Sequence, residues 1–230
     1  MNPNISNKKG VTPISAAAHK GNTIIMQTLI DAGSDVNALN SSGSTALIQA
    51  SHFGHVDAVK LLLSHQASAD FANHKGTTAL MRAAQEGHLD ISTLLLTAKA
   101  EVNRKNHEGM NALMLASQRG HSEMVHLLIT KGAVMDEQTS QGSTALMLAC
   151  KRGHDKCVEV LVGMGAEIYI KDTRGRTARD TATRRNHFGL LACLDTQVQV
   201  RCVLLTLSPH LIFYLNLTLT EQSLGSIGMS

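Results

Sequence analysis

Apolar and polar positions along the chain follow a pattern that predicts pairs of short helices. Residues 46–53 form an alanine-rich stretch, and Gly54 follows where a left-handed residue commonly ends a helix. Apolar residues then return at helical spacing over about residues 55–64 and form one stripe to be buried, made of Val56, Val59, Leu62 and Leu63. Thr45 precedes the first stretch, where its hydroxyl can cap the helix. The pattern predicts two antiparallel helices joined at a glycine.

This arrangement recurs along the chain with a single period. The short segment that starts each first helix begins at residues 12, 45, 78, 111, 144 and 177, in steps of 33 residues. Glycines follow the same step at residues 10, 43, 76, 109, 142 and 175, and again at 21, 54, 87, 120 and 153. Three series with one period and no insertion indicate tandem structural repeats.

A polar stretch with glycine at its fourth position links consecutive units. Asn40-Ser41-Ser42-Gly43 is one example, and its residue types are those of a type I turn. Each unit is therefore expected to hold two helices and a projecting turn. One such unit cannot bury its own apolar face and has to stack on its neighbours. The sequence predicts an all-α solenoid.

The unit resembles the ankyrin repeat. The segments Gly43 to Leu47, Gly54-His55 and Asp35-Val36-Asn37 carry the resemblance. It implies an all-α solenoid of stacked helix–turn–helix units with projecting β-turns, whose six units start near residues 8, 41, 74, 107, 140 and 173. The histidine that usually follows the Thr-Pro-Leu motif of the family is absent from this chain. We expect packing to replace its hydrogen bond.

Two segments are expected to lie outside the repeat domain of residues 8–199. Residues 1–7 are expected to form an N-terminal extension, and residues 200–230 a leucine-rich C-terminal tail. Two interpretations of the tail stay open: a disordered segment, or a truncated or alternative end of a longer protein. Its apolar stretch over residues 203–219 is too short and too polar to predict a transmembrane helix, and no membrane contact is expected.

The cysteines say more about the cellular compartment than the net charge does. The net charge of +3 over 230 residues points to no class of partner. The four cysteines form no dense framework, and the first residues carry no apolar signal segment. We expect a cytoplasmic protein with free thiols, and the nucleus is a second expected location.

No residue pattern predicts an enzyme, a cofactor, a metal ion or a small-molecule substrate. The chain lacks a phosphate-binding glycine loop and a nucleophile elbow. Histidines recur at residues 55, 88, 121 and 154, but stacked helices lie about 8–10 Å apart, too far for successive rings to share a zinc ion. We expect each of these rings to start a second helix and tie the adjoining loop. Cys150 and Cys157 occupy apolar positions of the repeat and are expected to be buried thiols.

The resemblance implies that the turn tips and the ends of the first helices line a concave face that binds a protein, as in a scaffold or adaptor. The residues at these positions vary between units, whereas the glycines and leucines do not. Phe53 is the strongest candidate for a single anchor. The expected binding residues are His52, Phe53, His74, Lys75, Gln85, Glu86, His107, Glu108, Gln118, Arg119, Lys151, Arg152, Arg174, Arg176, Arg184 and Arg185.

The C-terminal units are basic. Residues 151–185 carry nine Lys or Arg and five Asp or Glu, which predicts an acidic or phosphorylated protein segment as the ligand of this end. A nucleic-acid or phospho-ligand is the alternative, and nucleic acid is disfavoured because aromatic residues for base stacking are scarce. A second alternative is a regulatory fragment of a larger protein, such as a ubiquitin-ligase adaptor or a kinase.

One asparagine is a candidate for modification. Leu29 followed by Asp35-Val36-Asn37 resembles the sequence read by the asparaginyl hydroxylase that modifies ankyrin repeats, and the segment ending at Asn103 is a weaker version. The resemblance therefore implies hydroxylation of Asn37. The competing interpretation is that the Asn37 side chain only holds its turn by a hydrogen bond.

Overall fold

The structure is a computed structural model that describes residues 3–8 and 10–195. Within these residues there are eleven labelled α-helices, one further helical segment and no strand. The helices are α1 (Pro13–His19), α2 (Thr23–Asp31), α3 (Ala46–Phe53), α4 (Val56–Ser64), α5 (Ala79–Glu86), α6 (Leu89–Thr97), α7 (Ala112–Arg119), α8 (Ser122–Thr130), α9 (Ala145–Arg152), α10 (Asp155–Gly163) and α11 (Ala178–Arg184). Residues 189–195 are helical as well. The expected tail of residues 200–230 and the domain boundary at residue 199 lie outside the described residues.

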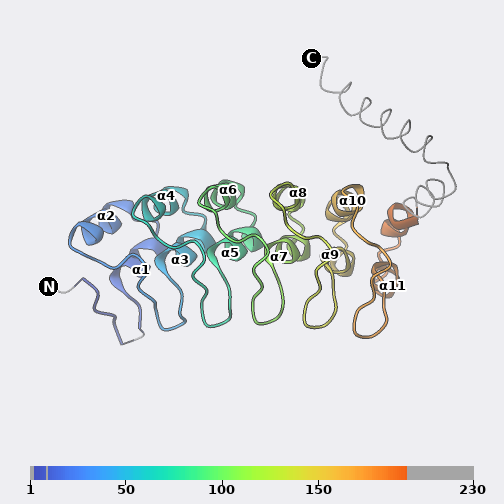
Figure 1. The fold of residues 1–230 in the computed structure, drawn as a ribbon, viewed down its shortest axis with the longest axis horizontal. Coiled ribbons are helices and arrows are strands. Elements are labelled where there is room, and N and C mark those ends of the chain that lie inside the picture. The colour runs from blue at the N-terminus through green and yellow to red at the C-terminus, as the bar shows by residue number, and fades with distance from the viewer. Residues whose placement is uncertain (1–2, 9, 196–230) are drawn as a thin grey trace, which may run out of the picture.

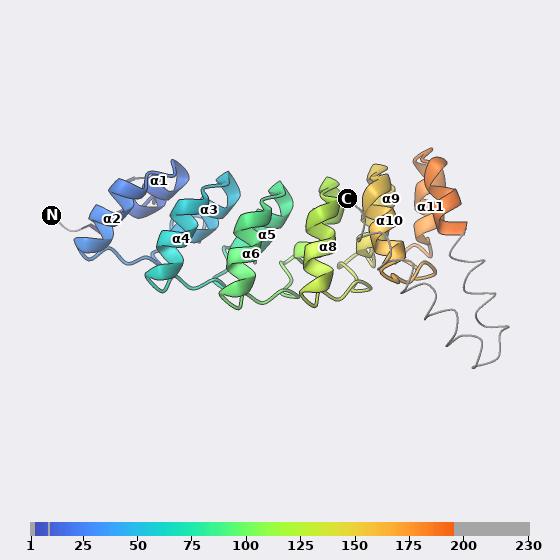
Figure 2. The same cartoon turned by 90° about the horizontal axis from the view of Figure 1, so that it is seen from above.

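The helices form two rows, and the turns project beyond one of them (Figure 1). The first helix of each unit, from α1 to α11 in odd numbers, packs against the first helix of the next unit and against the second helix of its own. Seen from above, the units stand side by side along the long axis (Figure 2). The predicted all-α solenoid is confirmed.

Capping residues set the ends of the first helices. The Thr45 hydroxyl oxygen accepts a hydrogen bond from the Ile48 backbone N–H at 3.3 Å, and Asn111 does the same for Met114 at 2.9 Å. Gly54 then ends α3 in the left-handed conformation, with φ of 79°. These are the caps that the sequence predicts, because they satisfy backbone groups that a helix terminus leaves unpaired.

The recurring histidines stand at the starts of the second helices, as expected, and their rings connect neighbouring units. The Nε2 atom of His121 donates to the Gln85 carbonyl at the end of the preceding first helix, at 3.1 Å. His55, His88 and His154 make the same contact one unit apart. A Cβ atom on Gly87 would lie 2.7 Å from the His121 ring. Each repeat therefore needs glycine at this position, because φ is positive there and because the histidine ring of the next unit leaves no room for a side chain.

A second set of hydrogen bonds connects units through Asn and Asp side chains. The Asn103 side-chain oxygen accepts from the Val134 backbone N–H at 2.9 Å, and Asp70 accepts from Glu101 in the same way. The series begins at Asn4, which accepts from the Asp35 N–H at 2.8 Å. Part of the expected extension of residues 1–7 thus takes part in the stacking of the first units.

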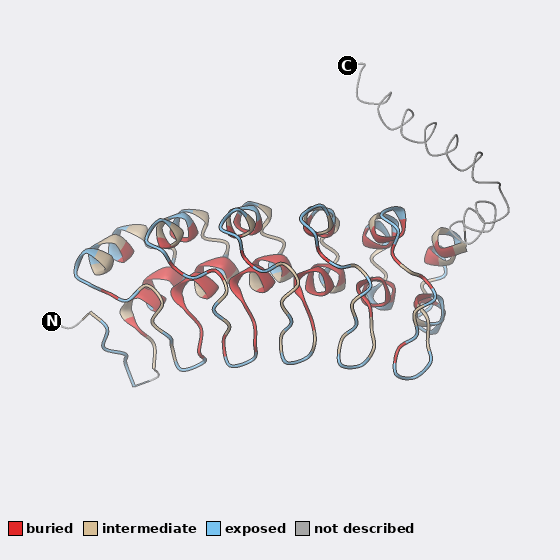
Figure 3. Cartoon of the chain, viewed as in Figure 1, coloured by how far each residue is buried: buried red, intermediate tan, exposed pale blue. Residues whose placement is uncertain are grey.

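The core is one continuous layer between the two rows of helices (Figure 3). Its small residues lie in the first helices, where Ala50, Ala83 and Ala116 are fully buried. Methionines replace the missing family histidine after the helix start, and Met81 and Met114 are each only 1% exposed. Packing therefore occupies the position of the absent hydrogen bond, as expected.

We expect His121→Ala to destabilise the stack by about 1–2 kcal/mol, because the Gln85 carbonyl would lose its partner across the unit boundary. His126→Ala is the matched control, since His126 lies exposed on the same helix α8. Urea unfolding followed by circular dichroism measures both. Equal stability of the two variants would contradict a structural role for the recurring histidine.

Candidate functional site

Three cavities lie between the turns and the first helices. The first, of about 300 Å³, lies between α3 and α5, and the second, of about 470 Å³, between α5 and α7. The third, of about 390 Å³, lies between α9 and α11. We call the surface formed by the turn and first-helix residues that line these cavities the inner groove. The turns that form its wall are joined side by side by backbone hydrogen bonds, such as His107 N–H to the Lys75 carbonyl at 3.1 Å.

One position in the middle of each first helix forms the floor of the inner groove. It precedes a buried alanine in α3, α5, α7, α9 and α11, and its residue type differs among these helices except that α7 and α9 both carry leucine. Its residues are Gln49, Arg82, Leu115, Leu148 and Thr181. Sequence analysis did not select this position. Its variation between constant neighbours is the signal by which it could have been found.

Most of the residues expected to bind a partner line these cavities. The twelve that do are His52, His74, Lys75, Gln85, His107, Glu108, Gln118, Lys151, Arg174, Arg176, Arg184 and Arg185. The other four, Phe53, Glu86, Arg119 and Arg152, lie at the ends of first helices and line none of the three. Helix ends thus separate into residues that face the groove and residues that flank it.

Phe53 lies among histidine rings. Its side chain is 42% exposed, and its ring centroid lies 4.1 Å from that of His19 and 4.6 Å from that of His52. Burial lowers the pKa of His52, and the positive charge of Arg82 lowers it further, whereas Glu86, 3.6 Å from Nδ1, opposes both. The lowered pKa leaves the His52 ring uncharged at neutral pH, with Arg82 as the neighbouring cation.

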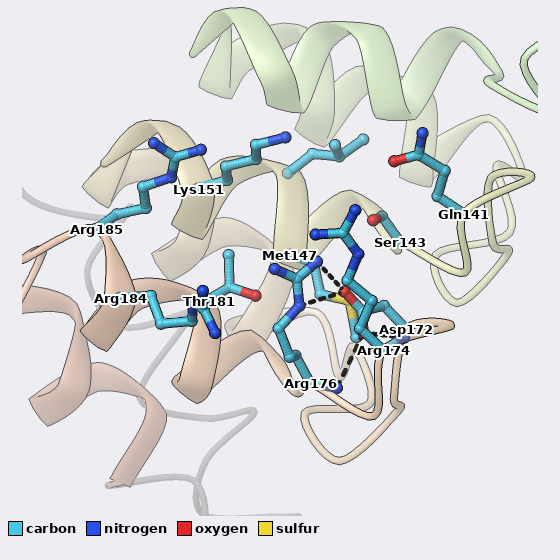
Figure 4. A pocket seen from close by; sticks show the side chains of 11 residues that line it. Gln141, Ser143, Met147, Lys151, Asp172, Arg174, Arg176, Thr181, Arg184 and Arg185 are labelled. Carbon is cyan, nitrogen blue, oxygen red and sulfur yellow. Dashed lines mark hydrogen bonds and ion pairs between the residues drawn. The ribbon is translucent and has the colours of Figure 1, made fainter.

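The cavity between α9 and α11 gathers basic side chains, and we call it the basic pocket (Figure 4). Lys151 comes from α9, Arg174 and Arg176 from the adjoining turn, and Arg184 and Arg185 from the end of α11. The remaining lining residues are Gln141, Ser143, Met147, Leu148, Asp172 and Thr181. The basic end predicted from the sequence is therefore a defined hollow in which several cations meet.

Arg176 differs from the other cations of the basic pocket, because its charge is already balanced. Its Nε atom donates to an Asp172 carboxylate oxygen at 2.8 Å, and its terminal nitrogen to the same oxygen at 2.5 Å. The Arg176 side chain, followed by backbone N–H groups of the turn, lowers the pKa of Asp172 to about 2. Arg176 therefore forms part of the pocket wall and holds the turn.

We expect Asp172→Asn to cost about 1–2 kcal/mol at neutral pH, because it removes the charge that pairs with Arg176. It keeps the turn, since Asn40 accepts the same two backbone N–H bonds in its own unit. Asp172→Ala also loses the bonds from Arg174 and Arg176 N–H, both 2.9 Å, and should cost more.

The pH dependence follows from the sign of the pKa change. A carboxylate with a depressed pKa stabilises the fold fully above its unfolded pKa and loses that contribution as the pH falls toward the folded value of about 2. Urea unfolding of the native chain and Asp172→Asn at pH 7 and at about pH 3 should show a smaller difference at the lower pH. A difference that stays constant would contradict the assignment.

Asn37 is half-buried and holds the next unit. Its side-chain oxygen accepts from the Ser68 backbone N–H at 2.9 Å, while its own N–H donates to Asp35 at 2.9 Å. Asn103 occupies the same place in its own unit. The Asn37 side chain therefore does more than hold its own turn, because it also accepts a hydrogen bond from the next unit. Hydroxylation of Asn37 stays a prediction.

We expect Asn37 to gain one oxygen atom when the protein is expressed together with an asparaginyl hydroxylase, and Asn103 to gain less. Peptide mass spectrometry measures both. Asn37→Asp is the control, because Asp70 and Asp136 serve the same hydrogen bond in other units. An unmodified Asn37 in the presence of active hydroxylase would remove the prediction.

Cys150 and Cys157 are buried thiols. Burial raises the pKa of Cys150 to about 12, with a further contribution from Cys193, and raises the pKa of Cys157 to about 11. Both thiols are therefore protonated at neutral pH, which makes them poor nucleophiles. In the part of the chain that the structure describes, no three His, Cys, Asp or Glu side chains gather to hold a metal ion.

Comparison with known proteins places the repeat in a family. The family model for ankyrin repeats (3 copies) matches residues 1–73, 80–172 and 113–196. No curated protein matches the chain. Among the described helices, none has the length and apolar character needed to cross a membrane. The matched segments include α3, α7, α9 and α11 with the turns before them, whereas residues 74–79, which hold part of the turn before α5, fall outside the matches.

Proposed function

Because the chain belongs to the ankyrin-repeat family, whose repeats generally mediate contacts between proteins, we propose that it is a scaffold or adaptor that binds a partner protein in the inner groove. The observation that carries the proposal is the floor of that groove. Its residues vary from Gln49 and Arg82 to Leu115, while the neighbouring alanines are constant and fully buried. A surface that varies on a constant scaffold is suited to recognition.

The groove offers a partner different chemistry along its length. Arg82 lines both cavities beside α5, where its guanidinium donates to Gln85 at 3.2 Å and pairs with no carboxylate among the described residues. Leu115, which is only 8% exposed, is the residue of α7 at the floor of the cavity between α5 and α7. The basic pocket follows at the end. These features support a partner segment that is acidic or phosphorylated at the end nearest α11.

Variants of the groove test the proposal. We expect Arg82→Ala combined with Gln118→Ala to lower the recovery of partner proteins several-fold, since both side chains line the cavity between α5 and α7. Lys60→Ala combined with Glu123→Ala is the control, because these exposed residues lie on second helices away from the groove.

Affinity capture with quantitative mass spectrometry compares the two double variants with the native chain, and circular dichroism verifies their folding. Equal recovery by native chain and groove variant, or equal loss from both variants, would show that binding does not run through the inner groove.

A further inference from the structure

The fold separates paired from unpaired cations around the basic pocket. Arg176 is paired with Asp172, and Arg179, which does not line the pocket, is paired with Asp195. By contrast, Lys151, Arg174, Arg184 and Arg185 line the pocket and pair with no carboxylate within residues 3–8 and 10–195. Four uncompensated positive charges from α9, a turn and the end of α11 thus surround one hollow (Figure 4).

Asp172 and Asp180, the carboxylates of the turn and helix α11 beside the pocket, already accept hydrogen bonds within the fold. Asp172 is the one carboxylate that lines the pocket, and it accepts from Arg176 and from two backbone N–H groups. Asp180 caps the start of α11 by accepting from the Thr177 backbone N–H at 2.9 Å and from its hydroxyl at 2.8 Å. Neither carboxylate is available to neutralise the four cations, which are exposed and leave the pocket positively charged toward an anionic ligand.

We propose that the basic pocket binds the phosphate group of a phosphoserine or phosphothreonine in a segment of the partner protein. This proposal rests on the proposed function and specifies the ligand of one end of the groove. A phosphate carries about −1.5 to −2 charges and three acceptor oxygens, whereas a carboxylate carries one charge and two oxygens. Four cations, three of them arginines that can bind two oxygens at once, match the phosphate better.

The walls of the pocket favour a peptide over a nucleic acid. Ser143 and Gln141 line it beside the cations and offer neutral polar groups to a peptide backbone, while Met147 and Leu148 are 3% and 7% exposed and add little apolar surface. Among the described residues no aromatic side chain lines it, so a nucleobase would find no ring there to stack on. The volume of about 390 Å³ accommodates a phosphorylated side chain with adjoining backbone.

Immobilised peptide libraries provide the test. Three libraries share randomised flanks and differ at one fixed position, which is phosphoserine, glutamate or serine. We expect the full chain to be retained by the phosphoserine library at least about tenfold more than by the serine library, and clearly more than by the glutamate library.

Matched variants locate the binding. Arg184→Gln with Arg185→Gln should abolish the preference for phosphoserine, and Lys151→Gln with Arg174→Gln is a second pair in case the first fails to fold by circular dichroism. Lys156→Gln with Lys171→Gln is the control: it removes the same number of charges from exposed side chains that do not line the pocket. It should keep the preference.

Each other outcome overturns the proposal. Equal retention by glutamate and phosphoserine libraries would mean that the pocket reads acidic segments only, which leaves the proposed function intact. An equal loss of the preference in Lys156→Gln with Lys171→Gln and in Arg184→Gln with Arg185→Gln would indicate a diffuse electrostatic field. Displacement of the phosphopeptides by a single-stranded oligonucleotide that itself requires the same arginines would assign the pocket to nucleic acid. If the chain shows no preference for phosphoserine, the pocket is not a phosphate site. The proposed function is then tested separately by the groove variant Arg82→Ala with Gln118→Ala.

Discussion

The contact between successive first helices is the interaction on which the rest of the molecule depends. Fully buried alanines, among them Ala50, Ala83 and Ala116, lie in these helices and leave no side-chain bulk to hold neighbours apart. Since a single helix pair cannot cover its own apolar face, stacking supplies the core. Stacking also aligns the turns, and the inner groove exists only because of that alignment.

Hydrogen bonds between units fix the register of the stack. The ring of each recurring histidine reaches a carbonyl of the previous unit, and Asn or Asp side chains reach a backbone N–H of the next. These bonds are directional, whereas apolar contact alone would tolerate rotation of one unit against another. Gly87 shows the consequence, because the space of its absent side chain is filled by the His121 ring.

The sequence predicted the architecture closely and the site only in part. Period, caps and turns depend on local residue types such as Thr45 and Gly54, so they can be read from one unit. The floor of the groove was missed because a position in the middle of a short buried helix, such as Leu115, has the pattern of core. Arg184 was selected as an exposed cation, but its convergence with Lys151 and Arg174 depends on the stacking geometry. Nor does sequence pattern show that Arg176 would be neutralised by Asp172 while Arg174 would not.

The residues of the groove floor differ from the residues that hold the units together, and this difference has a consequence for the evolution of the molecule. Replacing Gln49, Arg82 or Leu148 alters what the groove presents without touching the alanines, glycines or histidines that hold the units together. Neighbouring units supply neighbouring portions of one recognition surface. Substitutions at the partly exposed floor positions, such as Gln49 and Arg82, can therefore change specificity one unit at a time.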